Sequence, residues 1–137
     1  MTAFAEPENH LIWFFTRDDT QLAKTVANDY GAGERIGGAD AMFVVTSRDQ
    51  DLQACLGGRL TLTLDRTRID KYWNAVVAAW YPEGRGDPRL SMLRFETRDA
   101  QVWLTEAGPM RFAWEIARAN LTHREPNLGE QAHLDLS

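Results

Sequence analysis

The chain has 137 residues, of which 44% are hydrophobic and 26% charged, with a formal net charge of −5. This length suits one domain with its own hydrophobic core, and the acidic balance argues against broad nucleic-acid binding, which depends on neutralising phosphates. We see no signal peptide and no apolar run long enough to span a bilayer, so we expect a cytoplasmic protein without a membrane partner.

The first half of the chain predicts several strands and one short helix. Residues 11–16 (LIWFFT) form a continuous apolar run, as expected of a strand buried on both faces. Residues 18–20 offer N-caps for a short helix in which Leu22 and Val26 should face inward. After a Gly-rich loop, the strands expected from β-branched content and alternation cover residues 41–47, 52–55 and 59–65.

The segment from Asp65 to Pro88 is the most distinctive part of the sequence. Its apolar residues follow the spacing of one helical stripe, which predicts an amphipathic helix with Thr67 and Asp70 as a weak capping box. A turn rich in Pro and Gly follows it, and Asp87 is expected as a turn residue. The stripe consists of Ile69, Tyr72, Trp73, Val76, Val77 and Trp80.

The remaining elements are a hairpin and a final helix. Residues 90–97 and 100–105 resemble two strands joined by a turn, and a bulge or bend is expected at the glycine pair 57–58. Pro109 should open the last helix. Short strands with two or three helices indicate a small β-barrel or sandwich with α elements.

We expect one domain over residues 1–122 and a disordered tail over residues 123–137, because the tail is polar and unpatterned. The three histidines lie near the termini without ligand spacing, so no metal site is expected. Cys55 has no Cys or His partner nearby and is interpreted as a small buried hydrophobe. The sequence shows no self-contained catalytic apparatus, so a bound cofactor should supply any chemistry.

The order of several motifs carries family information. They are IWFFT at residues 12–16, the segment at 51–55 with Gly58 after it, the segment at 65–88, LRF at 93–95 and AQVW at 100–103. Together they resemble the general stress protein branch of the pyridoxamine 5′-phosphate-oxidase-like flavoproteins. The resemblance implies a mainly β split barrel, which is a Greek-key antiparallel barrel with flanking helices. It also implies a homodimer that binds a flavin at its interface, usually FMN, with FAD as an alternative.

Individual positions match flavin-binding positions of these relatives. Phe15 and Thr16 match an aromatic-Thr pair that lines the flavin, and Thr20 matches a Ser that contacts its phosphate. A hydroxyl at a helix N-terminus suits an anion. Trp103 matches an aromatic residue that stacks near the ring, and a packed strand residue explains it equally well.

Two departures from the family pattern affect the expected site. Leu22 stands where relatives usually carry a Lys, and Lys24 could compensate in part as a cofactor-binding residue. Residues 1–3 match the end of an Arg-Pro-Met segment, so the preceding helix, most of the first strand and a flavin-contacting Arg are expected to be missing. Arg111 follows without the motif that holds substrate in the oxidases, so pyridoxamine-phosphate oxidase activity is not expected.

Two functions stay open at this point. The first is an FMN-binding stress protein, with flavin-dependent oxidoreductase activity on a small molecule as a hypothesis. The alternative is a non-catalytic split-barrel dimer that senses or sequesters flavin, or has lost flavin binding. No catalytic residue, substrate or electron donor is assigned by the sequence.

Overall fold

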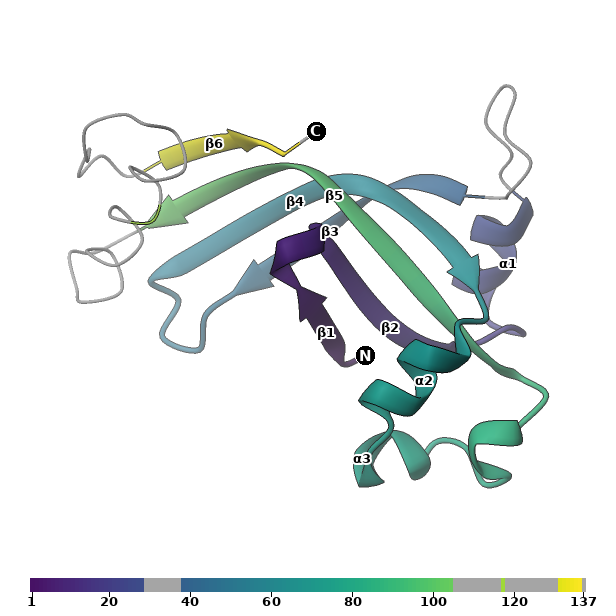
Figure 1. Ribbon diagram of the computed structural model, residues 1–137. Coiled ribbons are helices and arrows are strands. Elements are labelled where there is room, and N and C mark those ends of the chain that lie inside the picture. The colour runs from purple at the N-terminus through teal and green to yellow at the C-terminus, as the bar shows by residue number, and fades with distance from the viewer. Residues whose placement is uncertain (29–37, 105–116, 118–130, 137) are drawn as a thin grey trace. The chain divides into compact units, whose positions relative to one another are not determined.

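The strands of the protein form one six-stranded sheet. The structure is a computed structural model that describes residues 1–28, 38–104, 117 and 131–136. The strand order is β1-β2-β5-β4-β3, and β6 pairs with β5 outside this path (Figure 1). The strands are β1 (Ala3–Glu6), β2 (Leu11–Arg17), β3 (Gly38–Thr46), β4 (Leu52–Thr63), β5 (Leu90–Leu104) and β6 (Gln131–Asp135).

Three short α-helices and two 3-10 turns accompany the strands in the described ranges. The helices are α1 (Gln21–Asn28), α2 (Arg66–Tyr72) and α3 (Ala75–Ala78), and the turns are η1 (Pro7–Asn9) and η2 (Gly84–Gly86). The chain divides into two compact units, one formed by residues 1–41 and 58–98 and the other by residues 42–57 and 99–137. In the described residues, no helix is both long enough and apolar enough to cross a membrane.

Strand β2 lies at the centre of the first unit. It pairs antiparallel with β1, from Ala3 opposite Phe14, and antiparallel with β5, from Leu11 opposite Glu96. Residues 11–14 are all buried, which confirms the prediction of a strand buried on both faces. The core around it consists of Leu11, Trp13, Ile69, Val77, Tyr81, Leu90 and Met92. Each large apolar side chain buried in this way contributes about 1.5–3 kcal/mol to folding.

The predicted single helix after Asp65 is wrong, because the chain breaks it at Trp73 and Asn74. Trp73 is extended, with φ −62° and ψ 128°, and the side chain of Asn74 accepts a hydrogen bond from the backbone N of Val77 at 2.9 Å. Asn favours such caps over helix interiors because its short amide competes for backbone groups. The N-cap of α2 is Asp65, not the expected Thr67 box, since Asp65 accepts from the backbone N of Arg68.

The predicted hairpin over residues 90–105 is wrong as well, because β5 is one continuous strand of 15 residues. Two-residue hairpins require positive φ, and neither Arg98 nor Asp99 adopts it. The buried positions change parity between Thr97 and Ala100, and this break in the alternation is what resembled a turn. Strand β4 is likewise continuous through its two glycines.

One expectation for helix α1 differs from the structure. Val26 on α1 is buried as predicted, but Leu22 is 44% exposed, and Ala23 faces the interior in its place. A helix of eight residues has room for one narrow buried stripe, and the i, i+3 pair 23 and 26 fills it.

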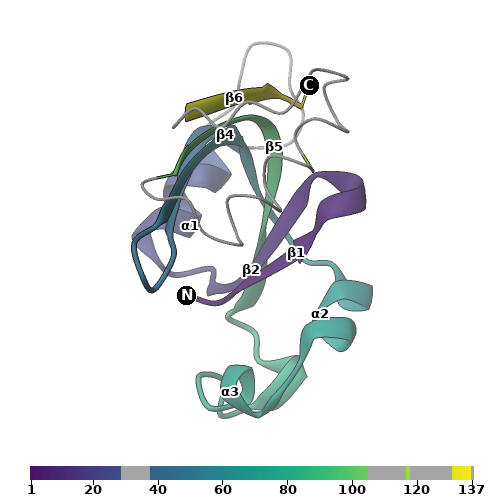
Figure 2. The same ribbon diagram turned by 90° about the vertical axis from the view of Figure 1, so that its left-hand side faces the viewer.

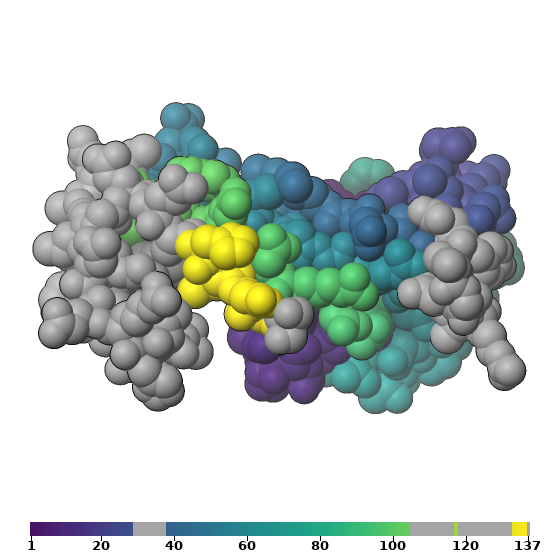
Figure 3. Space-filling view, turned by 90° about the horizontal axis from the view of Figure 1, so that it is seen from above, coloured from purple at the N-terminus to yellow at the C-terminus, as the bar shows by residue number. Residues whose placement is uncertain are grey.

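The end of the chain contains a strand where a disordered tail was expected. Strand β6 pairs antiparallel with β5, from Asp99 opposite Asp135 to Trp103 opposite Gln131, and Figure 3 shows it in yellow at the surface beside β5. This pairing depends on backbone hydrogen bonds between the two strands. The side-chain pattern of the tail therefore does not predict the strand. The expected helix from Pro109 and most of the Gly-rich loop lie outside the described residues.

Candidate functional site

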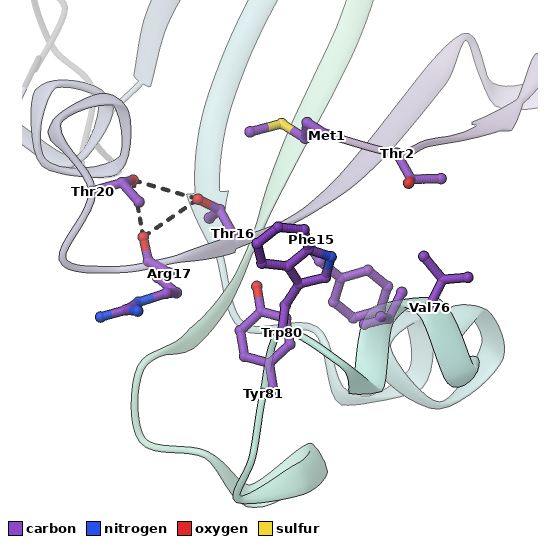
Figure 4. Close-up of a pocket in the computed structure, with 10 residues that line it drawn as sticks. Met1, Thr2, Phe15, Thr16, Arg17, Thr20, Val76, Trp80 and Tyr81 are labelled. Carbon is purple, nitrogen blue, oxygen red and sulfur yellow. Dashed lines mark hydrogen bonds between the residues drawn. The ribbon is translucent and has the colours of Figure 1, made fainter.

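A cavity of about 490 Å³ opens in the first unit, within the size range of small-molecule sites. It lies where β2 ends, where α1 begins and beside α3 (Figure 4). The residues that line it are Met1, Thr2, Phe15, Thr16, Arg17, Thr20, Val76, Val77, Trp80 and Tyr81.

One wall of the cavity is aromatic. Phe15 contacts the rings of Trp73 and Tyr81, with ring centroids 6.0 and 6.5 Å apart. Trp80 and Tyr81 follow α3 in a turn, in which the backbone N of Trp80 donates to Val77 O at 3.0 Å. Tyr81 is buried, whereas Trp80 is 74% exposed at the rim. Such a wall suits a flat apolar ring system.

The opposite end of the cavity is polar. Thr16 and Thr20 place their hydroxyl oxygens 3.4 Å apart, and both hydroxyls donate to the backbone carbonyl of Arg17, as the dashed lines in Figure 4 show. Thr20 also accepts from the backbone N of Ala23 at 3.2 Å, so it is the N-cap of α1. Hydroxyls beside the positive end of a helix favour an anion.

Arg17 adds a positive charge to this polar end. Its Nε donates to Asp19 Oδ1 at 3.0 Å, and its Nη2 contacts the other carboxylate oxygen. This pairing raises the pKa of Arg17 and lowers the pKa of Asp19, so both groups are charged at neutral pH. Burial raises the pKa of Tyr81, which keeps its phenol protonated and able to donate.

The structure brings together three of the five predicted site residues, since Phe15, Thr16 and Thr20 all line the cavity. Lys24 instead lines a separate surface depression on α1. Trp103 is half-buried on β5 in the second unit.

Several lining residues were not among the predicted site residues, because the sequence predicted only a helix and a turn for the Asp65–Pro88 segment. Trp80 and Tyr81 belong to that segment, and they reach the cavity because the helix breaks at Asn74. The available signal was Asn74, which lies in the sequence between the stripe residues Trp73 and Val76. Arg17 was not predicted as a site residue because it directly follows the predicted strand 11–16, where a charged residue is expected at a strand end.

No cluster of three or more His, Cys, Asp or Glu side chains that could hold a metal ion occurs among the described residues. The residues of the cavity do fit a flavin, because the aromatic wall suits its ring system. The two hydroxyls, the guanidinium and the start of α1 suit its phosphate.

The family model described as pyridoxamine 5′-phosphate oxidase like matches residues 1–127. The chain belongs to this family. Its membership and its mainly β split-barrel fold class, both predicted from the sequence, are confirmed by the family model and by solved structures of relatives.

Three solved structures resemble this family member along most of its length. A candidate general stress protein 26 from Jannaschia sp. is 36% identical with TM-score 0.70, covering 99% of this chain and 81% of its own. A general stress FMN/FAD binding protein from Xanthomonas citri is 35% identical with TM-score 0.66, covering 79% and 70%. A candidate general stress family protein from Xanthomonas campestris pv. campestris is 34% identical with TM-score 0.65, covering 79% and 75%. No curated protein matches the chain.

Proposed function

We propose that this pyridoxamine 5′-phosphate-oxidase-like protein binds FMN in the cavity beside α3. The observation that carries the proposal is that one cavity has an aromatic wall at Phe15, Trp80 and Tyr81 and a pair of hydroxyls at Thr16 and Thr20. The relative from Xanthomonas citri, described as FMN/FAD binding, supports a flavin as the ligand. A bound flavin would supply hydride or single-electron transfer.

The residues of the cavity have separate roles in this proposal. Phe15 and Tyr81 exclude water from the ring, while Thr16 and Thr20 orient the phosphate against the start of α1. Tyr81 is a neutral phenol whose hydroxyl can donate a hydrogen bond. FAD fits the same chemistry, because its first phosphate would occupy the same polar end.

The proposed assembly is a homodimer with the flavin at the interface. Its support is the exposed apolar rim of the cavity, where Val76 is 65% and Trp80 74% exposed. Exposed apolar side chains around a ligand site are typical of a surface that another chain covers. Trp103 stays a proposed flavin contact, as does Lys24.

The proposed activity is a flavin-dependent oxidoreductase acting on a small molecule. The second candidate, a non-catalytic protein that senses or sequesters flavin, is favoured by Leu22, which stands exposed on α1 where oxidases of the family place a Lys. Reduction of the bound flavin by NADPH or NADH, followed by turnover with oxygen or a small acceptor, separates the two candidates.

The test of flavin binding is titration of the purified protein with FMN, monitored by the visible absorption and fluorescence of the flavin. Thr16→Val should weaken FMN binding about tenfold, since loss of a hydrogen bond to a charged phosphate costs about 1.5 kcal/mol. Thr46→Val, which removes an exposed hydroxyl on β3, is the matched control and should leave the affinity unchanged. A protein that binds neither FMN nor FAD contradicts the proposed function.

A further inference from the structure

Arg17 is already engaged by a carboxylate of its own chain. Its Nε and Nη2 contact the two oxygens of Asp19, which is the bidentate arrangement that a guanidinium also offers to a phosphate. Figure 4 shows the Arg17 side chain extending away from Phe15, Trp80 and Tyr81, although Arg17 lines the cavity with them. Arg17 therefore meets Thr16 and Thr20 through its backbone carbonyl, while its guanidinium is turned toward Asp19.

A comparison with the neighbouring ion pair, Asp87–Arg89, indicates that Asp19 could be displaced from Arg17 by another anion. The side chain of Asp87 is fully buried and accepts from Arg89 three times, once from its backbone N at 2.9 Å and twice from its guanidinium at 3.3 Å. The side chain of Asp19 is 44% exposed, and that of Arg17 is 42% exposed. Water screens an ion pair with such exposure, so Asp19 can leave Arg17 at little cost, whereas Asp87 would lose its partner inside the protein if it left Arg89.

We propose that Asp19 is a built-in competitor of the ligand's phosphate. A phosphate monoester that reaches Thr16 and Thr20 displaces Asp19 and takes over the guanidinium of Arg17. The exchange is favourable because the phosphate carries up to two negative charges and also accepts from both hydroxyls, which turn to it from the backbone carbonyl of Arg17. The inference rests on the proposed function and adds a device that sets the affinity for phosphorylated ligands.

This device acts on the phosphate alone. Asp19 lowers the affinity for FMN, whose phosphate needs Arg17, and leaves unchanged the affinity for riboflavin, which has the same ring and no phosphate. Arg17 thereby replaces the cation that Leu22 does not supply on α1.

The experiment compares Asp19→Asn with Asp18→Asn, using FMN and riboflavin as probes in titrations at low ionic strength. Both variants remove one negative charge from the same loop, but Asp18 is an exposed residue outside the Arg17 pair. Asp19→Asn should bind FMN about 3- to 10-fold more tightly and riboflavin with unchanged affinity. Asp18→Asn should change both affinities less than about twofold, and Arg17→Gln should weaken FMN binding alone.

The outcomes separate the inference from the proposed function. Equal gains in FMN affinity for the two Asn variants mean a general charge effect, and no gain for Asp19→Asn means no competition. Either result overturns the inference while flavin binding stands. A protein that binds neither FMN nor riboflavin overturns the proposed function, and the inference falls with it.

Discussion

Glu6 is a buried carboxylate that connects β1 to α2. It accepts from the hydroxyl of Tyr72 at 2.7 Å, from the guanidinium of Arg68 at 3.3 Å and from the amide of Asn9 at 3.3 Å, and Figure 2 shows the helix beside the strand. The hydrogen bond from Tyr72 is the largest cause that lowers the pKa of Glu6 from 4.5 to about 2. Glu6 is therefore ionised and fully partnered in the folded protein.

Glu6→Gln should destabilise the fold by about 2 kcal/mol, because a neutral amide weakens these charge-assisted hydrogen bonds. Since the folded pKa is below the unfolded value of 4.5, the stabilisation by Glu6 is present above pH 4.5 and is lost as the pH falls through about 2. Thermal unfolding from pH 7 to pH 2 measures this. The two proteins should converge in stability at the acid end, and Glu8→Gln, at an exposed position, should follow the wild type.

The site residues could be predicted from the sequence only where a short family motif contains them. Phe15, Thr16 and Thr20 follow one another closely on β2 and at the start of α1, so a family motif was enough to select them. Trp80 and Tyr81 depend on where a helix stops, and a stripe of apolar spacing does not show that. Their position follows from the side chain of Asn74, whose hydrogen bond to Val77 competes with helix continuation.

At the scale of elements, the close approach of β4 to β5 depends on Gly58. A Cβ atom at this position would lie 2.0 Å from the backbone oxygen of Glu96, a contact that only backbone movement could relieve. Gly58→Ala should therefore cost about 3 kcal/mol, measured by chemical unfolding. Gly86→Ala is the matched control, because nothing lies within 4 Å of its added methyl group, and it should cost less than about 1 kcal/mol.

The cap of α3 is the element that places the aromatic wall. Asn74→Ala removes the hydrogen bond to the backbone N of Val77 and should cost about 1 kcal/mol of stability. Because Trp80 and Tyr81 follow this helix directly, the variant should also weaken FMN binding. Asn74→Asp keeps a capping oxygen and should retain both properties. Equal losses in the two variants would show that the cap does not position the wall.

Strands were predicted correctly where an apolar run marked them. They were predicted wrongly where the alternation of buried residues and the backbone pairing indicated different boundaries. The apolar run of β2 marked a buried strand, and the structure has that strand at Leu11–Arg17. In β5, a change of buried parity between Thr97 and Ala100 resembled a turn, although pairing with β2 and β6 continues along the strand. Backbone pairing with a distant partner is not encoded in local alternation, so β6 could not be predicted either.

At the scale of the whole molecule, the exposed apolar rim of the cavity bears on assembly. Val76 and Trp80 line the cavity and are 65% and 74% exposed. Covering them would remove apolar surface from water and close the cavity over its ligand. Dimerisation and flavin affinity should therefore be linked, each raising the other.

Val76→Glu should weaken the proposed dimer and FMN binding together, because it places a charge in the rim that the proposed partner would cover, next to the cavity. Sedimentation at several protein concentrations, with and without FMN, measures both effects. Thr67→Glu, which puts the same charge on an exposed position of α2, should leave them unchanged. If Val76→Glu lowers FMN affinity while the mass stays that of a dimer, the rim is part of the site but not of the interface. If the wild type sediments as a 15.6 kDa monomer with FMN bound, the site is complete in one chain.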